Sequence, residues 1–146
     1  MVADDELHST VASRLRRDQQ RYTAGRRSLV DALADAGRPV TIPELLRDSS
    51  GLALSSAYRN LAVLERAGVV HRIVTTDEFA RYELAEDLTR HHHHLICSAC
   101  GGVTDFEVSD TIEHELESAL ARVAERTGFT VRNHRLDLVG TCSACS

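Results

Sequence analysis

The chain has 146 residues, 42% of them hydrophobic and 27% charged, so it is long enough for one ordinary domain or two small ones. It has no run of roughly 18 apolar residues, as a membrane span requires, and the first twenty residues contain no apolar secretion signal. We therefore expect a cytoplasmic protein without membrane contact. The formal net charge of −5 argues against indiscriminate binding to nucleic acid.

The charge is unevenly distributed along the chain. Residues 13–30 hold one acid, Asp18, and six arginines, which are Arg14, Arg16, Arg17, Arg21, Arg26 and Arg27. A local basic patch on an acidic protein can bind phosphates, although a run of charges is often only the solvated face of a helix. We interpret His8, in a frayed N-terminus, as a surface residue.

Three short helices are predicted between Thr23 and Gly68. The first is capped by Thr23 and ends at Gly37. Its apolar face is formed by Leu29, Val30, Leu33 and Ala36. The second opens at Thr41-x-x-Glu44, which has the spacing of a capping box. The third is capped by Ser55 or Ser56 after the break SSGLAL, and its inward face is formed by Ala57, Leu61 and Leu64.

A β-hairpin is predicted after the third helix, from VVHRIV, the polar turn TTDE and FARYEL. A hairpin in this place is the wing of a winged helix-turn-helix, in which the third helix enters the major groove by its N-terminal end. The side chains that we expect to touch DNA are Arg21, Arg26, Ser55, Ser56, Tyr58 and Arg59. For Tyr58, a core aromatic is the alternative interpretation.

The second half of the chain is predicted to be a separate α/β unit. The predicted domains are residues 1–84 and 91–146, joined by the polar hinge 85–90. Strands are expected at His91–Cys97, Val103–Val108 and in FTVRNHRLDLVG. A helix is expected from the capping-box spacing Asp110-x-x-Glu113 to Gly128, and His114 lies on its polar face. The helix carries an apolar stripe of Ile112, Leu116, Leu120 and Val123.

Two Cys-x-x-Cys pairs are the strongest chemical signal in the sequence. They are Cys97/Cys100 and Cys142/Cys145. In a reducing cytosol, such pairs are better explained as zinc ligands than as disulfides. Four thiolates complete a closed tetrahedral zinc shell with no position for water, so the site would be structural.

Four consecutive histidines, His91 to His94, directly precede the first pair. A purification tag or a disordered tract is an alternative, but the run is internal and continues into an apolar strand. Successive side chains of a strand point to opposite faces, so His91 and His93 face one way and His92 and His94 the other. One run can therefore serve two metal sites. Possible partners elsewhere are His134, which precedes the second cysteine pair, and Glu113.

These motifs, in this order, resemble the ferric uptake regulator family of metal-dependent bacterial repressors. The resemblance covers nearly the whole chain. It includes Ser56-Ala57-Tyr58-Arg59, Tyr82-Glu83-Leu84, His91 to Gly101, Ile112-Glu113, Asn133-His134 and Gly140-Thr141-Cys142. The all-histidine run and the closing Cys-x-x-Cys look most like the zinc uptake regulator branch.

The resemblance implies three metal sites. Cys97, Cys100, Cys142 and Cys145 match the structural zinc site. His91, His93, Glu113 and His134 match a second site in the dimerisation domain, which is either structural or sensory. For the regulatory site the resemblance implies His71, Glu83, His92 and His94. Glu86 or Asp87 is the alternative to Glu83, because two extra residues separate Glu83 from the histidines.

The function implied is that of a zinc-responsive, homodimeric repressor that binds palindromic operators of metal-uptake genes in double-stranded DNA. An iron- or peroxide-responsive repressor is the alternative, since Fe²⁺ or another divalent metal suits imidazole and carboxylate ligands. A zinc hydrolase or deaminase is disfavoured, because the cysteines are saturated and no His-Glu-x-x-His helix is present. A metal-storage protein would not explain the helix-turn-helix.

Overall fold

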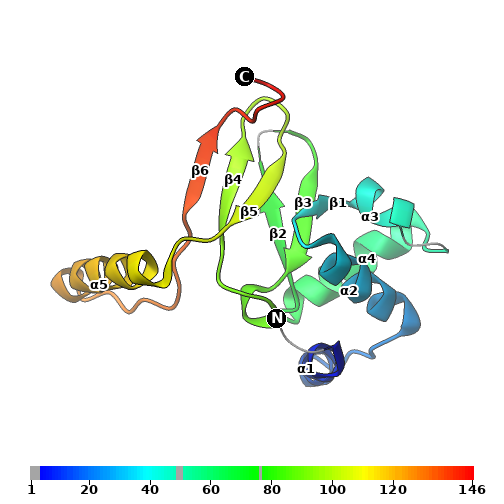
Figure 1. Cartoon of the computed structure of the whole chain (residues 1–146). Helices are drawn as coiled ribbons and strands as arrows, with labels where there is room; N and C mark the ends of the chain where they lie inside the picture. The colour runs from blue at the N-terminus through cyan, green and yellow to red at the C-terminus, as the bar shows by residue number, and fades with distance from the viewer. Residues whose placement is uncertain (1–3, 49–50, 76) are drawn as a thin grey trace.

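The computed structural model describes residues 4–48, 51–75 and 77–146. In chain order its elements are α1 (Asp4–Arg17), α2 (Ala24–Ala36), β1 (Val40–Thr41), α3 (Ile42–Asp48), α4 (Leu54–Arg66), β2 (Val70–Val74), β3 (Ala80–Leu84), the 3-10 turn η1 (Glu86–Leu88), β4 (His93–Cys97), β5 (Val103–Phe106), α5 (Asp110–Thr127) and β6 (Asp137–Gly140). Helices α1 to α4 lie on one side of the molecule and α5 on the other, with the strands between them (Figure 1). No described helix is both long and apolar enough to cross a membrane.

The N-terminal residues form a helix, so the expectation of a frayed terminus was wrong. Leu7, Val11 and Leu15 recur every four residues of α1. All three are buried in the core of the first unit, which we define as the elements from α1 to β3; the second unit comprises β4 to β6. This apolar stripe holds α1 against the other helices. His8 follows Leu7 inward and is 5% exposed, which also corrects its interpretation as a surface residue.

The expected caps are confirmed at α2 and α3. Thr23 Oγ1 accepts a hydrogen bond from Arg26 N at 3.3 Å, and Gly37 ends the helix with a φ of 61°. At α3, Thr41 N donates to Glu44 Oε2 at 2.8 Å and Glu44 N donates to Thr41 Oγ1 at 3.3 Å, which is a reciprocal capping box.

The predicted cap of α4 was wrong. The helix begins at Leu54, before both candidate serines, and its N-cap Ala53 makes no side-chain hydrogen bond. Ser49 and Ser50, in the preceding break, lie outside the described residues. Burial of the apolar face holds this helix in place, because Ala57, Leu61 and Leu64 are each 0% exposed, as expected.

The predicted hairpin is confirmed. β2 pairs antiparallel with β3, and β1 adds to the other edge of β3. The turn of this wing reaches the loop between β4 and β5, which we call the knuckle (residues 97–102). Thr75 Oγ1 donates to Gly101 O at 3.3 Å, so the wing and the second unit are in contact.

The second sheet has the order β5-β4-β6, with β4 and β5 antiparallel and β4 and β6 parallel. All three strands are shorter than predicted. Pairing begins at His93 rather than His91, and β5 ends at Phe106 rather than Val108. Residues 129–136 are not a strand, so only Asp137–Gly140 joins the sheet. The cap of α5 is Ser109, whose Oγ accepts from Ile112 N at 3.3 Å. The expected capping box at Asp110 is therefore displaced, and the Glu113 side chain is available for other partners.

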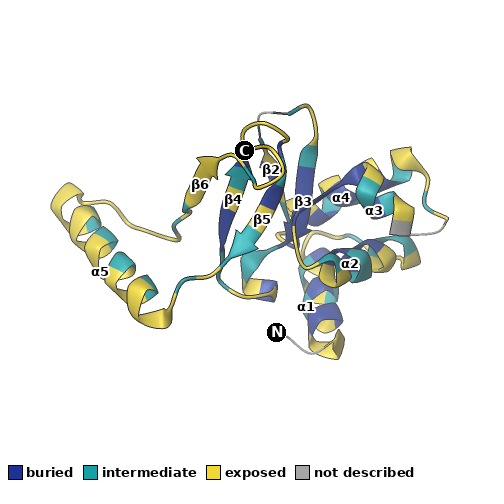
Figure 2. Ribbon diagram, turned by 45° about the horizontal axis from the view of Figure 1, so that its top comes forward, coloured by how far each residue is buried: buried dark blue, intermediate teal, exposed yellow. Residues whose placement is uncertain are grey.

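Helix α5 projects away from the sheet (Figure 1), and none of its residues is buried. Figure 2 shows α5 and β6 almost wholly exposed, in contrast to the helices of the first unit. Apolar side chains on this side include Ile112, Val123, Phe129, Leu138 and Val139, all between 47% and 70% exposed. Among the described residues, the predicted apolar stripe of α5 is thus left largely uncovered: Ile112 and Val123 are exposed, and Leu116 and Leu120 are half-buried.

Candidate metal centres

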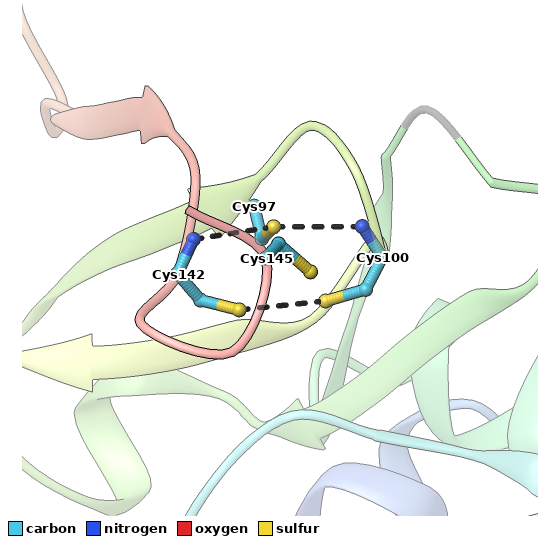
Figure 3. Close-up of side chains that lie close together, drawn as sticks. All are labelled: Cys97, Cys100, Cys142 and Cys145. Carbon is cyan, nitrogen blue, oxygen red and sulfur yellow. Dashed lines mark hydrogen bonds between the residues drawn. The ribbon is translucent and has the colours of Figure 1, made fainter.

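The four cysteines converge from two loops that lie 42 residues apart (Figure 3). Cys97 and Cys100 come from the knuckle, and Cys142 and Cys145 follow β6. The parallel pairing of β6 with β4 places Gly140 opposite Cys97, which brings the two pairs together. The four sulfur atoms lie within 4.8 Å of one another, and Cys100 Sγ is 4.0 Å from Cys142 Sγ. Zinc–sulfur bonds of about 2.3 Å put sulfur atoms roughly 3.8 Å apart in a tetrahedron, so this tetracysteine group fits a zinc ion.

Backbone amides prepare the tetracysteine group for a cation. The amides of Cys100 and Cys142 both donate to Cys97 Sγ at 3.4 Å, which lowers the pKa of Cys97 to about 6. Hydrogen bonding to Cys142 and its neighbours raises the pKa of the Cys145 thiol to about 12. Four clustered thiolates repel one another unless a cation lies among them, so zinc would deprotonate the whole group.

A second group, the His91 group, joins three histidines around one carboxylate. It consists of His91, His93, Glu113 and His134. Glu113 Oε1 lies 2.8 Å from His91 Nε2 and from His134 Nε2, while Glu113 Oε2 lies 2.8 Å from His93 Nε2. Burial raises the pKa of Glu113, but the hydrogen bonds from His93 and His91 outweigh it and lower this pKa to about 2. The carboxylate is therefore charged and positioned as a metal ligand.

Glu86 orients the same group from outside. Its Oε1 is 2.8 Å from His91 Nδ1, the ring nitrogen that does not face Glu113. Burial lowers the pKa of His91, but the hydrogen bonds to Glu86 and Glu113 raise it above the usual range. Metal-binding histidines commonly donate their second N–H to a carboxylate in this way. Glu86 therefore pairs with His91 and does not take the place of Glu83 as a candidate metal ligand. Asp87, the other predicted alternative to Glu83, is paired with Arg14.

The third group, which we call the His92 group, lies between the wing and the second sheet. It consists of Glu83, His92, His94 and Asp105. Glu83 comes from β3 of the wing, and the other three come from β4, the residue before it and β5. Glu83 Oε1 is 2.8 Å from His94 Nε2, and Glu83 Oε2 is 3.1 Å from His92 Nε2. The structure shows the predicted alternation of the histidine run. His91 and His93 join one group and His92 and His94 join another, although the strand starts only at His93.

Charge is strongly coupled within the His92 group. Burial raises the pKa of Glu83, but hydrogen bonds to His71, His92 and His94 outweigh it and hold this pKa well below the usual range. The hydrogen bond to Glu83 in turn raises the pKa of His92 to about 9. Burial and repulsion by Glu83 raise the pKa of Asp105 to about 6. In the metal-free protein, protons on the histidines therefore take the place of a cation.

The atoms of Asp105 test whether a metal fits the His92 group. Asp105 Oδ1 is buried and has no hydrogen-bond partner among the described residues. It lies 3.5 Å from His94 Nε2, and Asp105 Oδ2 lies 3.7 Å from His92 Nε2. Ligand atoms about 2.1 Å from a zinc ion are roughly 3.4 Å apart in a tetrahedron. A metal ion would therefore satisfy the unpaired oxygen, and two imidazoles with two carboxylates also suit iron or manganese.

Asp105 was not among the predicted residues of this group, whereas His71 was. His71 Nδ1 lies 3.7 Å from Glu83 Oε1, and the residue faces Glu83 across the β2–β3 ladder, but it is not among the four clustered ligands. A signal for Asp105 was present. The knuckle is a tight turn that pairs β4 antiparallel with β5. Counting residues outward from this turn along both strands places Asp105 directly opposite His94.

The candidate DNA-contacting residues lie at the N-terminal end of α4, on α2 and, for Arg21, in the loop between α1 and α2. Tyr58 is 55% exposed, so the alternative of a core aromatic was wrong. Ser55, Arg59 and Arg21 are also exposed, and Ser56 is half-buried. Arg26 is less free, since its guanidinium donates to Asn60 Oδ1 at 3.1 Å, to Gln20 Oε1 at 3.2 Å and to Arg21 O at 2.7 Å.

A winged helix-turn-helix joined to a second unit, with two metal-ligand groups inside that unit and a third between the two, defines a metal-responsive transcriptional regulator and not an enzyme. The Ferric uptake regulator family model matches residues 17–139, and the chain belongs to this family. The peroxide-responsive repressor PerR of Staphylococcus aureus is 29% identical to it over 147 residues, which cover 97% of this chain and 93% of the relative.

Solved structures agree with this assignment. A zinc-bound manganese uptake regulator is 30% identical, with a TM-score of 0.64 over 93% of this chain and 98% of that one. The ferric uptake regulator Fur of Helicobacter pylori has the same fold, with a TM-score of 0.77 at 21% identity over 99% and 94% of the two chains. The names of these relatives refer to iron, manganese or peroxide. They therefore identify the family of this chain but no single regulatory metal.

Proposed function

We propose that this protein is a homodimeric repressor that binds operators of metal-uptake genes when zinc occupies the His92 group. One observation carries the proposal: Glu83 belongs to the wing, whereas His92, His94 and Asp105 belong to the second unit. A metal ion bound by both units would hold the wing and its helix α4 at one angle to the second sheet. Residues 85–90, which contain η1, would then act as the hinge between domains 1–84 and 91–146.

Metal binding would select one arrangement of the two units. In the closed form, the wing lies against the second sheet and all four ligands meet; in the open form, the two units are apart. To shift the equilibrium from mostly open to mostly closed, the metal must bind the closed form about 10⁴-fold better than the open form. The His92 group meets this demand because opening the hinge would remove Glu83, a buried and charged ligand, from the metal. Loss of metal would then release the DNA.

The second unit has the features of a dimer interface. β6 is an edge strand whose four residues are all exposed, and the apolar face of α5 is uncovered. A second copy of this chain would cover both, since open strand edges and exposed apolar faces favour association. A two-fold dimer presents two recognition helices to the two halves of a palindrome.

In this proposal the N-terminal end of α4 contacts the major groove. Tyr58 and Arg59 reach base edges or phosphates, Ser55 and Ser56 bind phosphates, and Arg21 adds a phosphate contact from the flank. Arg26 braces α2 against Asn60 of α4, so it positions the recognition helix and contributes little direct contact.

The other two groups would have structural roles. The tetracysteine group would hold the end of the chain to the knuckle, and zinc binding there would contribute folding free energy. The His91 group would tie α5 to β4, because Glu113 belongs to that helix and His93 to the strand. Both would stay filled while the His92 group exchanges metal.

An iron- and peroxide-responsive repressor is the second candidate. The two carboxylates of the His92 group favour it, as a set of oxygen and nitrogen ligands accepts Fe²⁺ or Mn²⁺ as well as zinc. The identity to PerR along nearly the whole chain agrees with it. Loss of operator binding upon peroxide treatment of the iron-loaded protein, with oxygen added to His92 or His94 in the mass spectrum, would decide for this candidate.

A gel-shift titration tests the first candidate. Operator binding should require zinc, be reversed by a chelator and be lost in His92→Ala. His91→Ala is the control, because its histidine belongs to the His91 group and faces away from Glu83; it should lower the melting temperature and leave the zinc concentration for half-maximal binding unchanged. Binding that is indifferent to both zinc and chelator would refute the proposal.

A further inference from the structure

We propose a fourth cation site, wholly within the first unit, formed by Asp4, His8 and Asp31. Asp4 and His8 are one turn apart on the same face of α1, and Asp31 comes from α2. One possible ligand atom from each of the three lies within 4.8 Å of the others. The site does not depend on the three groups in the second half of the chain.

His8 is held in the orientation that a metal ligand needs. The residue is 5% exposed, and its Nε2 lies 2.7 Å from Asp31 Oδ1. Its Nδ1 lies 2.5 Å from the Tyr22 hydroxyl, on the opposite side of the ring. With a metal on Nε2, the imidazole would keep its one proton on Nδ1 and donate it to the Tyr22 oxygen. A partner on the second nitrogen fixes the ring and its tautomer, as at known metal sites.

Apart from the His8 imidazole, the two carboxylates have no basic partner among the described residues. Among the described residues, no arginine forms an ion pair with Asp4 or Asp31, and the chain contains no lysine. Arg27 lies over the Tyr22 ring instead, 5.9 Å from its centroid. A bound cation would therefore relieve the repulsion between two acids that share one buried imidazole.

The ligand set indicates a hard divalent cation. One imidazole and two carboxylates, without sulfur, suit Mn²⁺ or Fe²⁺. The outer side is open to solvent, since Asp4 is exposed and the Asp31 side chain is 48% exposed, so water would complete the coordination. Such an ion would fasten α1 to α2. Helix α1 also holds the hinge through Arg14, which donates to Gly68 O at 2.6 Å and pairs with Asp87 of η1.

Manganese binding to the full-length protein loaded with three zinc ions per chain, one for each of the other three groups, tests the proposal. Mn²⁺ stands below zinc in the affinity order and does not displace it, so added Mn²⁺ reports on sites that zinc leaves free. Electron paramagnetic resonance should count one more bound Mn²⁺ in the wild type than in Asp4→Asn, or show binding about tenfold weaker in the variant. Asp5→Asn is the matched control, because Asp5 lies in the same exposed helical turn but outside the cluster.

Two outcomes would overturn the site. One is equal Mn²⁺ binding by the wild type and Asp4→Asn; the other is binding that fails to broaden the proton resonances of His8 and Tyr22. His8→Gln adds a further test, with circular dichroism to verify the fold. Because Asp4 is on the surface, Asp4→Asn should fold normally, so the result stands even if His8→Gln does not fold.

Discussion

The contact between the wing and the knuckle can be tested at a single glycine. Gly101 has a φ of +75°, and a Cβ atom placed on it would lie 2.2 Å from Asp77 Oδ2 and 2.4 Å from Asp77 Cγ. Ordinary contact begins near 3.4 Å, so in Gly101→Ala the Asp77 carboxylate has to recede by about 1.2 Å. We predict that this substitution pushes the wing away from the second unit.

Asp77 cannot recede without loss, because it is held from several sides. Arg81 Nη1 and Nη2 each donate to it at 2.9 Å, and the Thr75 hydroxyl, which shares its one proton between Asp77 and Gly101 O, lies 3.1 Å from it. Arg81 is itself 9% exposed, and this pairing satisfies its charge. Overpacking at such a site typically costs about 1–3 kcal/mol, in addition to about 1–2 kcal/mol for an alanine at positive φ.

The variant Gly128→Ala separates the free-energy cost of an alanine at positive φ from the cost of the steric clash with Asp77. Gly128 has a φ of +68°, in the same unit, and a Cβ there would meet nothing within 4 Å. In urea unfolding of the zinc-loaded protein followed by circular dichroism, Gly101→Ala should lose about 1–3 kcal/mol more than Gly128→Ala. Asp77→Gly should remove the clash, so the double variant Gly101→Ala/Asp77→Gly should be more stable than the sum of the two single effects implies. Equal losses in the two alanine variants, or strict additivity in the cycle, would refute the wing–knuckle contact.

Three further predictions concern the metal groups. Cys97→Ser should lower the bound zinc by about one ion per chain by elemental analysis, and should unfold the second unit or abolish its dimerisation in sedimentation, because zinc binding there is folding free energy. Asp105→Asn should weaken zinc-dependent operator binding about tenfold or more, whereas His71→Ala should have the smaller effect; the reverse order would show that the metal takes its ligand from β2. In chelator-treated protein, the His92 pKa of about 9 lies above its ordinary value of 6.5, so the stabilisation from its pairing with Glu83 is complete below pH 6.5 and lost as pH rises through 9. The melting temperature should fall over that interval while zinc affinity rises, since zinc binds the neutral imidazole; a melting temperature that rises instead would contradict the coupling.

Local patterns of the sequence were enough for much of the first unit. The caps of α2 and α3, the buried face of α4 and the β2–β3 hairpin all depend on residues within a few positions of one another, so propensity and periodicity predict them. The N-terminal helix was missed although Leu7, Val11 and Leu15 have helical spacing, because the run of charges around them resembles a solvated tail. Its stability comes from burial against the other helices, which short-range patterns do not contain.

The sequence by itself determined that the two cysteine pairs and the histidine run can bind metal, and how the histidine run divides. Alternation along an extended chain separates His91 and His93 from His92 and His94 wherever the rest of the molecule lies. Only the tertiary structure decided the remaining partners. The turn at the knuckle sets Asp105 opposite His94, and packing of α1 on α2 carries His8 to Asp31. These residues meet because strand pairing and helix packing join distant segments at distances that no local spacing specifies.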